Sequence, residues 1–160
     1  MRYSRRSTTI SFCLFFAALM MTLSASADWG IYESYIIVEA GNGNQYFAGG
    51  INSDEATAFN GLELGSFAQG ASLTLNGGEL KTWKNGGSNV CGGSLFYRVY
   101  PSGAAAGDFA SVALGYAGEL GGGNQKWEAT AAGINLASDL AAGDYVIDVW
   151  WQAEGNQYGG

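Results

Sequence analysis

The stretch "LAAGDYVIDVWWQA", residues 140–153, decides the fold class of this chain. From Tyr145 to Trp151 every second residue is large and apolar, whereas the set between them contains Asp148. Successive side chains of a β-strand point to opposite faces, so this alternation is typical of a strand with one buried face. The pattern predicts that Trp151 lies in the core and that Trp150 lies on the outer face.

The residues just before this strand predict how it begins. Leu140, Gly143 and Tyr145 form the pattern Leu-x-x-Gly-x-Tyr. This resembles the tyrosine corner of immunoglobulin-like sandwiches, in which a Tyr hydroxyl bonds back to the backbone a few residues upstream.

Short apolar runs between glycine clusters continue along the chain, which has 26 glycines and one proline. Such runs at short, regular spacing predict an all-β, antiparallel β-sandwich of the jelly-roll or immunoglobulin-like type. The Asn-Gly-Gly at 76–78 predicts a hairpin turn, and 135–143 has room for one short helical turn at most. The predicted strands are 31–39, 45–51, 71–75, 79–84, 94–100, 108–114, 125–131 and 144–153.

The first 27 residues have the pattern of a signal peptide. A basic start, with Arg5 and Arg6, precedes the apolar run 10–23, and Ala25-Ser26-Ala27 offers a cleavage site. The run is shorter than the ~18–20 residues that span a bilayer. We therefore expect a secreted or cell-surface protein with one domain at 28–160 and no membrane insertion after leader removal.

Charge excludes one class of partner. The predicted mature chain keeps all 14 acidic residues but only Lys81, Lys84, Arg98 and Lys126, which gives a net charge of −10. Such a field repels a phosphate backbone and an anionic membrane, so we expect no nucleic acid partner.

Composition also argues against catalysis and most metals. Without histidine the chain cannot build a Ser-His-Asp triad or a His-ligated zinc site. We expect a non-enzyme without a cofactor, with only a weak indication of Ca²⁺ in the oxygen-rich turns 39–45 and 52–55. Cys91 has no partner in the predicted mature chain; a buried free thiol is the favoured interpretation, and an intermolecular disulfide the alternative.

Aromatic residues on outer faces are the best functional lead. In "SLFYRVY" (94–100), alternation turns Leu95, Tyr97 and Val99 inward and the other set outward, and in "ELKTWK" (79–84) it turns Trp83 outward. Sugars pack their C–H faces on such rings, and polar neighbours bond the hydroxyl groups. The predicted ligand-binding residues are Trp150, Tyr100, Phe96, Trp83, Arg98 and Asp148.

Three stretches, containing "YESYIIVEAGNGNQYFAG", "LFYRVYPSG" and "GGNQKW", together resemble an uncharacterised β-sandwich module of large secreted bacterial surface proteins, which often carry a C-terminal secretion-sorting domain. The resemblance implies extracellular placement and a sandwich, but no activity. Such modules usually continue with one more strand where this sequence ends, and they often have a second cysteine where Gly121 and Gly122 stand here. Two alternatives follow for the last strand of the domain: the sequence is a fragment that lacks it, or the native fold leaves a sheet edge or groove unfilled.

Two functions follow as expectations. The first is a non-catalytic module that binds an extracellular ligand, most plausibly a polysaccharide, through its surface aromatics. The alternative is a structural subunit of an extracellular fibre or surface layer, a homo-oligomer that assembles by β-strand addition at the open edge.

Overall fold

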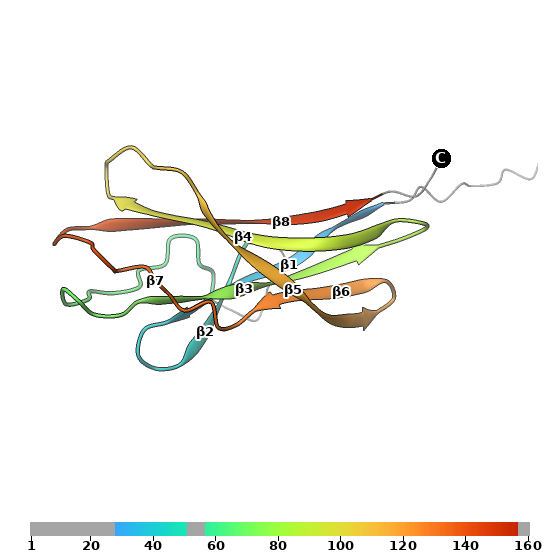
Figure 1. The fold of residues 1–160 in the computed structure, drawn as a ribbon, viewed down its shortest axis with the longest axis horizontal. Helices are drawn as coiled ribbons and strands as arrows, with labels where there is room; N and C mark the ends of the chain where they lie inside the picture. Colours follow the sequence, from blue (N-terminus) through green and yellow to red (C-terminus); the bar gives the residue numbers. More distant parts are fainter. Residues whose placement is uncertain (1–27, 51–56, 157–160) are drawn as a thin grey trace, which may run out of the picture.

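The computed structural model describes residues 28–50 and 57–156, and these form an all-β structure with no helix (Figure 1). The strands are β1 (Trp29–Glu39), β2 (Asn44–Ala48), β3 (Thr74–Lys84), β4 (Asn89–Pro101), β5 (Ala110–Gly121), β6 (Asn124–Ala129), β7 (Ile134–Asn135) and β8 (Tyr145–Asn156). The prediction of an all-β antiparallel fold is confirmed. The predicted leader, residues 1–27, lies outside the described residues.

All strands pair antiparallel in one continuous sheet of order β2-β1-β3-β6-β5-β4-β8, with β7 added beside β3. The sheet curls at β5, because Ala110–Leu114 pair with β4 whereas the residues from Gly115 onward pair with β6. Figure 1 shows β5 crossing between the two sides. The result is a half-barrel with a β1–β3–β6 wall and a β4–β8 wall. The finer prediction, a sandwich of two separate sheets, is not shown by this pairing.

The hydrophobic core fills the space between the two walls. Ile36, Leu75 and Leu80 of one wall and Leu95 of the other are fully buried in a single cluster. Ile147, Val149 and Trp151 pack against this cluster from β8. The alternation predicted for β8 is therefore confirmed, since Trp151 packs on the core and Trp150 is exposed.

Trp151 ties the β4–β8 wall to the opposite wall. Its indole N–H donates a hydrogen bond of 3.2 Å to the backbone oxygen of Tyr35 in β1. Gly78 of β3 provides room for the ring, because a Cβ there would lie 3.3 Å from the indole nitrogen and 2.7 Å from the Tyr35 oxygen.

The predicted hairpin turn at 76–78 is wrong, because β3 runs without interruption from Thr74 to Lys84. The glycines serve a bulge instead. The register between β1 and β3 shifts next to Gly77, whose φ is +126° and whose Cβ would lie 2.3 Å from the Ala129 oxygen of β6. The same residue types that form tight turns also permit bulges and close backbone approach.

The segment before β8 forms the predicted tyrosine corner. The Tyr145 hydroxyl donates a hydrogen bond of 3.1 Å to the backbone oxygen of Ala141. Residues 136–139 form a hydrogen-bonded turn and no helix. The corner fixes where β8 starts and thereby its register.

Replacing Gly78 with alanine should destabilise the fold by about 1–3 kcal/mol, because the new methyl group meets backbone and two packed side chains at once. Gly115→Ala is the matched control within a strand, since its Cβ would meet only the Glu128 oxygen at 3.8 Å. Urea unfolding followed by tryptophan fluorescence measures both. Equal stability of the two variants would contradict the role assigned to Gly78.

Candidate functional site

The pairing of β4 with β8 brings five of the six predicted ligand-binding residues together on the outer face of this wall, the face turned away from the core. Phe96 stands opposite Trp150, Arg98 opposite Asp148, and Tyr100 opposite Val146. The sequence could assign the faces of these strands but not their adjacency. We call Phe96, Arg98, Tyr100, Asp148 and Trp150, with Phe109 described below, the β4–β8 aromatic cluster.

Phe96 and Trp150 form a stacked pair. Their ring centroids are 4.1 Å apart and the ring planes differ by 7°. Because the two residues are direct cross-strand neighbours, the normal to both rings runs across the strands from β4 towards β8. Phe96 covers one face of the Trp150 ring, and β8 is the last strand in the order of the sheet. Trp150 is 40% exposed.

Arg98 and Asp148 form the next row of the cluster. The Arg98 Nε and Nη2 atoms donate hydrogen bonds of 2.9 and 2.7 Å to the same oxygen, Oδ2 of Asp148. A third bond of 3.2 Å runs from Nη1 to the backbone oxygen of Gly107, which ties the β4–β5 loop to the wall.

Phe109 is a member of the cluster that the sequence did not reveal. Its ring lies 4.2 Å below the Arg98 guanidinium carbon and meets Trp150 edge-on, with centroids 6.1 Å apart at 90°. Phe109 directly precedes β5, and the pairing of Tyr97 with Ala110 places it across from Arg98. Only the register of β4 against β5 could have indicated this, and a loop of unknown shape sets that register.

Tyr100 closes the cluster at its far end. The Arg98 guanidinium carbon lies 5.5 Å from its ring centroid. Desolvation and the neighbouring Asp148 carboxylate raise the pKa of Tyr100, although Arg98 opposes the shift. A hydrogen bond between the Tyr100 hydroxyl and the Asp148 carboxylate contributes to the raised pKa, so the hydroxyl proton is directed at Asp148 and the hydroxyl oxygen keeps acceptor capacity.

Trp83, the sixth predicted residue, lies apart from this cluster on the outer face of the opposite wall. Its ring covers Gly30 of β1, where a Cβ would lie 2.9 Å from the indole nitrogen. The same face carries a ladder of ion pairs in which Lys81 contacts Glu33 at 2.6 Å and Lys126 contacts Glu128 at 2.7 Å. Among the residues that the structure describes, no ring is stacked on Trp83.

Tyr35 belongs to the same ladder. Its hydroxyl donates a hydrogen bond to the Glu33 carboxylate. Burial, together with this bond, raises the pKa of Tyr35 to about 12. Burial would raise the pKa of Glu33 as well, but the bonds from Lys81 and Tyr35 outweigh it and lower that pKa. The charged and hydroxyl groups of this ladder are therefore paired with one another at neutral pH.

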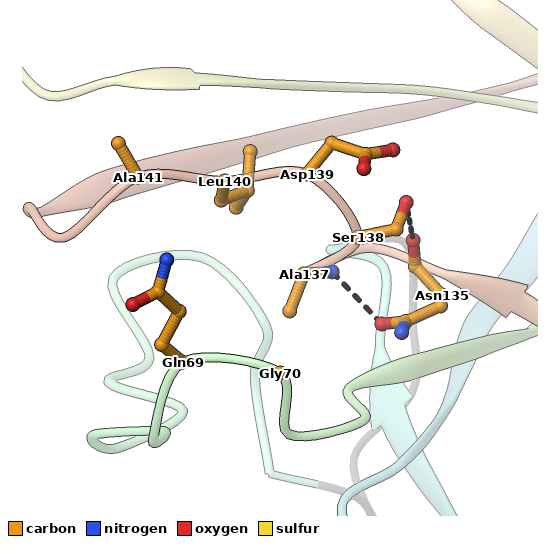
Figure 2. A pocket seen from close by; sticks show the side chains of 8 residues that line it. All are labelled: Gln69, Gly70, Asn135, Ala137, Ser138, Asp139, Leu140 and Ala141. Carbon is orange, nitrogen blue, oxygen red and sulfur yellow. Dashed lines mark hydrogen bonds between the residues drawn. The ribbon is translucent and has the colours of Figure 1, made fainter.

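A pocket of about 420 Å³ lies between the loop that contains Gln69 and Gly70 and the segment from Asn135 to Ala141 (Figure 2). Asn135 Oδ1 accepts hydrogen bonds there from the backbone N–H groups of Leu73 and Ala137, at 3.4 and 3.0 Å. The side chain of Asn135 thus holds the two loops together. No aromatic ring lines the pocket. The lining residues are Gln69, Gly70, Asn135, Ala137, Ser138, Asp139, Leu140 and Ala141.

Cys91 is exposed, so the prediction of a buried thiol is wrong. The register of β4 against β8 shifts between Val90 and Gly92, which makes Cys91 the extra residue of a bulge. A bulged residue escapes the inward and outward alternation on which the prediction relied. Its sulfur lies 3.5 Å from the Glu154 backbone oxygen.

The described residues contain no group of three or more acidic or cysteine side chains that could hold a metal ion. Of the two turns with the weak Ca²⁺ indication, 39–45 lies within these residues and 52–55 lies outside them. Within the same ranges no helix has the length and apolar character needed to cross a membrane.

Comparison with family models, with curated proteins and with solved structures finds no match to this chain. The assignment of a function therefore rests on the geometry of the site.

A double-mutant cycle with Phe96→Ala and Trp150→Ala should give a coupling free energy of about 0.5–1.5 kcal/mol, the usual value for a stacked aromatic pair. The free energy of unfolding in urea measures it. Trp83→Ala combined with Trp150→Ala is the control, and its effects should add within about 0.5 kcal/mol because the two rings lie on opposite outer faces. A Phe96–Trp150 coupling no larger than this control would contradict the stack.

Proposed function

We propose that this protein is a secreted, non-catalytic β-module that binds an extracellular glycan on the β4–β8 aromatic cluster. The single observation that carries the proposal is the Trp150 ring. Phe96 stacks on one of its faces, and the ring stays 40% exposed on the edge strand β8 beside the Arg98–Asp148 pair.

The physics of sugar recognition matches this arrangement. A pyranose ring presents C–H groups that pack on the face of an indole, and its hydroxyl groups need donors and acceptors at the rim. The Tyr100 hydroxyl is bonded to Asp148, and both the Tyr100 oxygen and the Asp148 carboxylate retain acceptor capacity for sugar hydroxyl groups. A braced ring also loses little side-chain entropy on binding.

Export through the leader is part of the proposal. The backbone oxygen of Asp28 accepts hydrogen bonds from Ser88 Oγ and from the N–H of Asn85, the latter at 3.0 Å. Removal of residues 1–27 at the Ala25-Ser26-Ala27 site would leave these contacts and all of β1 in place. We also assign the fold to the β-sandwich class, since the two walls pack face to face around one core.

Trp150→Ala should weaken glycan binding about tenfold or more, because it removes the stacking surface, and a loss of ~1.4 kcal/mol corresponds to that factor. Affinity electrophoresis against a panel of soluble polysaccharides measures it on the chain from Asp28 onward. Tyr46→Ala is the control, because Tyr46 is also exposed, at 44%, but lies on β2. Unchanged mobility shifts for Trp150→Ala would overturn the assignment of this site.

A second candidate function is assembly with other copies of the chain by strand addition at β8. β8 lies at one end of the strand order, and within the described residues it pairs only with β4, along twelve residues. The opposite edge is partly covered, since Ala48 of β2 exchanges backbone hydrogen bonds of 2.9 Å with Thr57 and Phe59. Uncovered edges are the usual sites of strand addition.

Sedimentation velocity of residues 28–160 over a concentration series tests this candidate. Assembly at β8 should give oligomers that grow with concentration, and Val149→Pro should reduce them because it removes a backbone donor and disturbs the edge strand. Circular dichroism checks that this variant keeps its sheet. A monomer over the whole series would exclude the assembly function and leave the glycan-binding proposal unaffected.

A further inference from the structure

Every basic side chain of the predicted mature chain is already engaged with a carboxylate. The stretches 51–56 and 157–160, outside the described residues, contain no lysine or arginine. No lysine or arginine of the predicted mature chain is therefore left without a carboxylate to receive an anionic ligand. The four pairs are Lys81–Glu33 at 2.6 Å, Lys84–Glu119 at 3.6 Å, Arg98–Asp148 at 2.7 Å and Lys126–Glu128 at 2.7 Å.

Arg98 is the basic residue of the β4–β8 aromatic cluster, and its donors are directed at the protein itself. Two bonds go to Asp148 and one to the Gly107 oxygen, and the guanidinium lies over the rings of Phe109 and Tyr100. Binding of a carboxylate or sulfate needs the planar fork of donors that Asp148 already occupies. Arg98 is thus a positioning residue for Phe109 and the β4–β5 loop.

The electrostatic field of the whole chain adds to the effect of these local charge pairs. The predicted mature chain carries a net charge of −10, which repels polyanions at long range. A cationic ligand would be attracted by that field, but salt screens it over about 8 Å at physiological ionic strength. Close to the rings, the Arg98–Asp148 pair leaves no net charge, so a cation has no unpaired carboxylate of the cluster to meet.

Resting on the proposed function, we infer that the β4–β8 aromatic cluster selects uncharged glycans and rejects acidic ones. Recognition comes from ring stacking and from hydrogen bonds made by the uncharged hydroxyl groups of the sugar. Binding therefore depends little on salt.

Matched polymers that differ only in charge test this inference. Dextran and hydroxyethyl cellulose are the neutral members, their carboxymethyl forms are the acidic members, and their diethylaminoethyl forms are the cationic members. Affinity electrophoresis of residues 28–160 should show retardation by a neutral polymer that is lost in Trp150→Ala. The acidic form of that polymer should bind at least about tenfold more weakly. The neutral affinity should change less than about twofold between 0.05 and 0.5 M NaCl.

The outcomes separate the inference from the function on which it rests. If no polymer shows binding that depends on Trp150, the proposed function fails and the inference fails with it. If Trp150-dependent binding is as tight for the carboxymethyl or diethylaminoethyl form as for the neutral one, the site binds glycans and only the inference is overturned.

A pair of variants tests whether the Arg98–Asp148 pair causes the rejection. Asp148→Asn weakens the hold on Arg98, and it should raise affinity for the carboxymethyl polymer about fivefold at low salt, as expected for about 1 kcal/mol of released charge. Glu154→Gln makes the same change in net charge on the same strand without touching Arg98, so it should give no such gain. Equal gains in the two variants would assign the rejection to net charge alone and overturn the role of the pair.

Discussion

The hydrogen bond from the Trp151 indole to the Tyr35 backbone oxygen is the contact on which the arrangement of the two walls depends. A half-barrel has an opening between its ends, and nothing in the pairing of a continuous sheet sets the spacing across it. Trp151 sets that spacing, because its ring reaches from β8 to the backbone of β1 and fills the interior next to Gly78 and Gly49. A buried indole N–H needs a partner, and here the partner lies on the opposite wall.

The same contact determines what the outer face presents. With Trp151 fixed inward, alternation along β8 turns Trp150 outward, and the register with β4 places it on Phe96. A slip of one residue would exchange the two tryptophans between core and solvent. The candidate site is therefore the reverse side of the core, and its precision depends on Trp151.

The all-β class, the faces of the strands and the start of β8 could be predicted from the sequence because each follows from local periodicity. The turn assigned to residues 76–78 failed because asparagine and glycine permit several backbone conformations, and the choice of a bulge depends on β6 and Trp151, which are distant in sequence. The prediction that Cys91 is buried was wrong for a similar reason, since a bulge shifts the phase of the alternation.

The candidate site, too, could be predicted only as far as local alternation determines it. Five of its residues could be proposed because alternation turns each of them outward on its own strand. That they lie together follows from strand order, which the sequence does not contain. Phe109 joins them only through the β4–β5 register, and Trp83 stands apart because β3 belongs to the other wall.

Alternation along the strands places different side chains on the two outer faces of the structure. On the β1–β3–β6 wall the outward positions hold Lys81 and Lys126 between glutamates, so charge is paired within a partly buried network. Both sides leave rings exposed, since Tyr46 of β2 is 44% exposed and Trp150 is 40% exposed, but the β4–β8 wall gathers four rings around one ion pair and stacks Phe96 on Trp150. A soluble protein gains nothing in stability by leaving such rings in water, and clustered exposed aromatics are characteristic of binding surfaces. The difference between the walls is therefore the physical reason to place the function on β4 and β8.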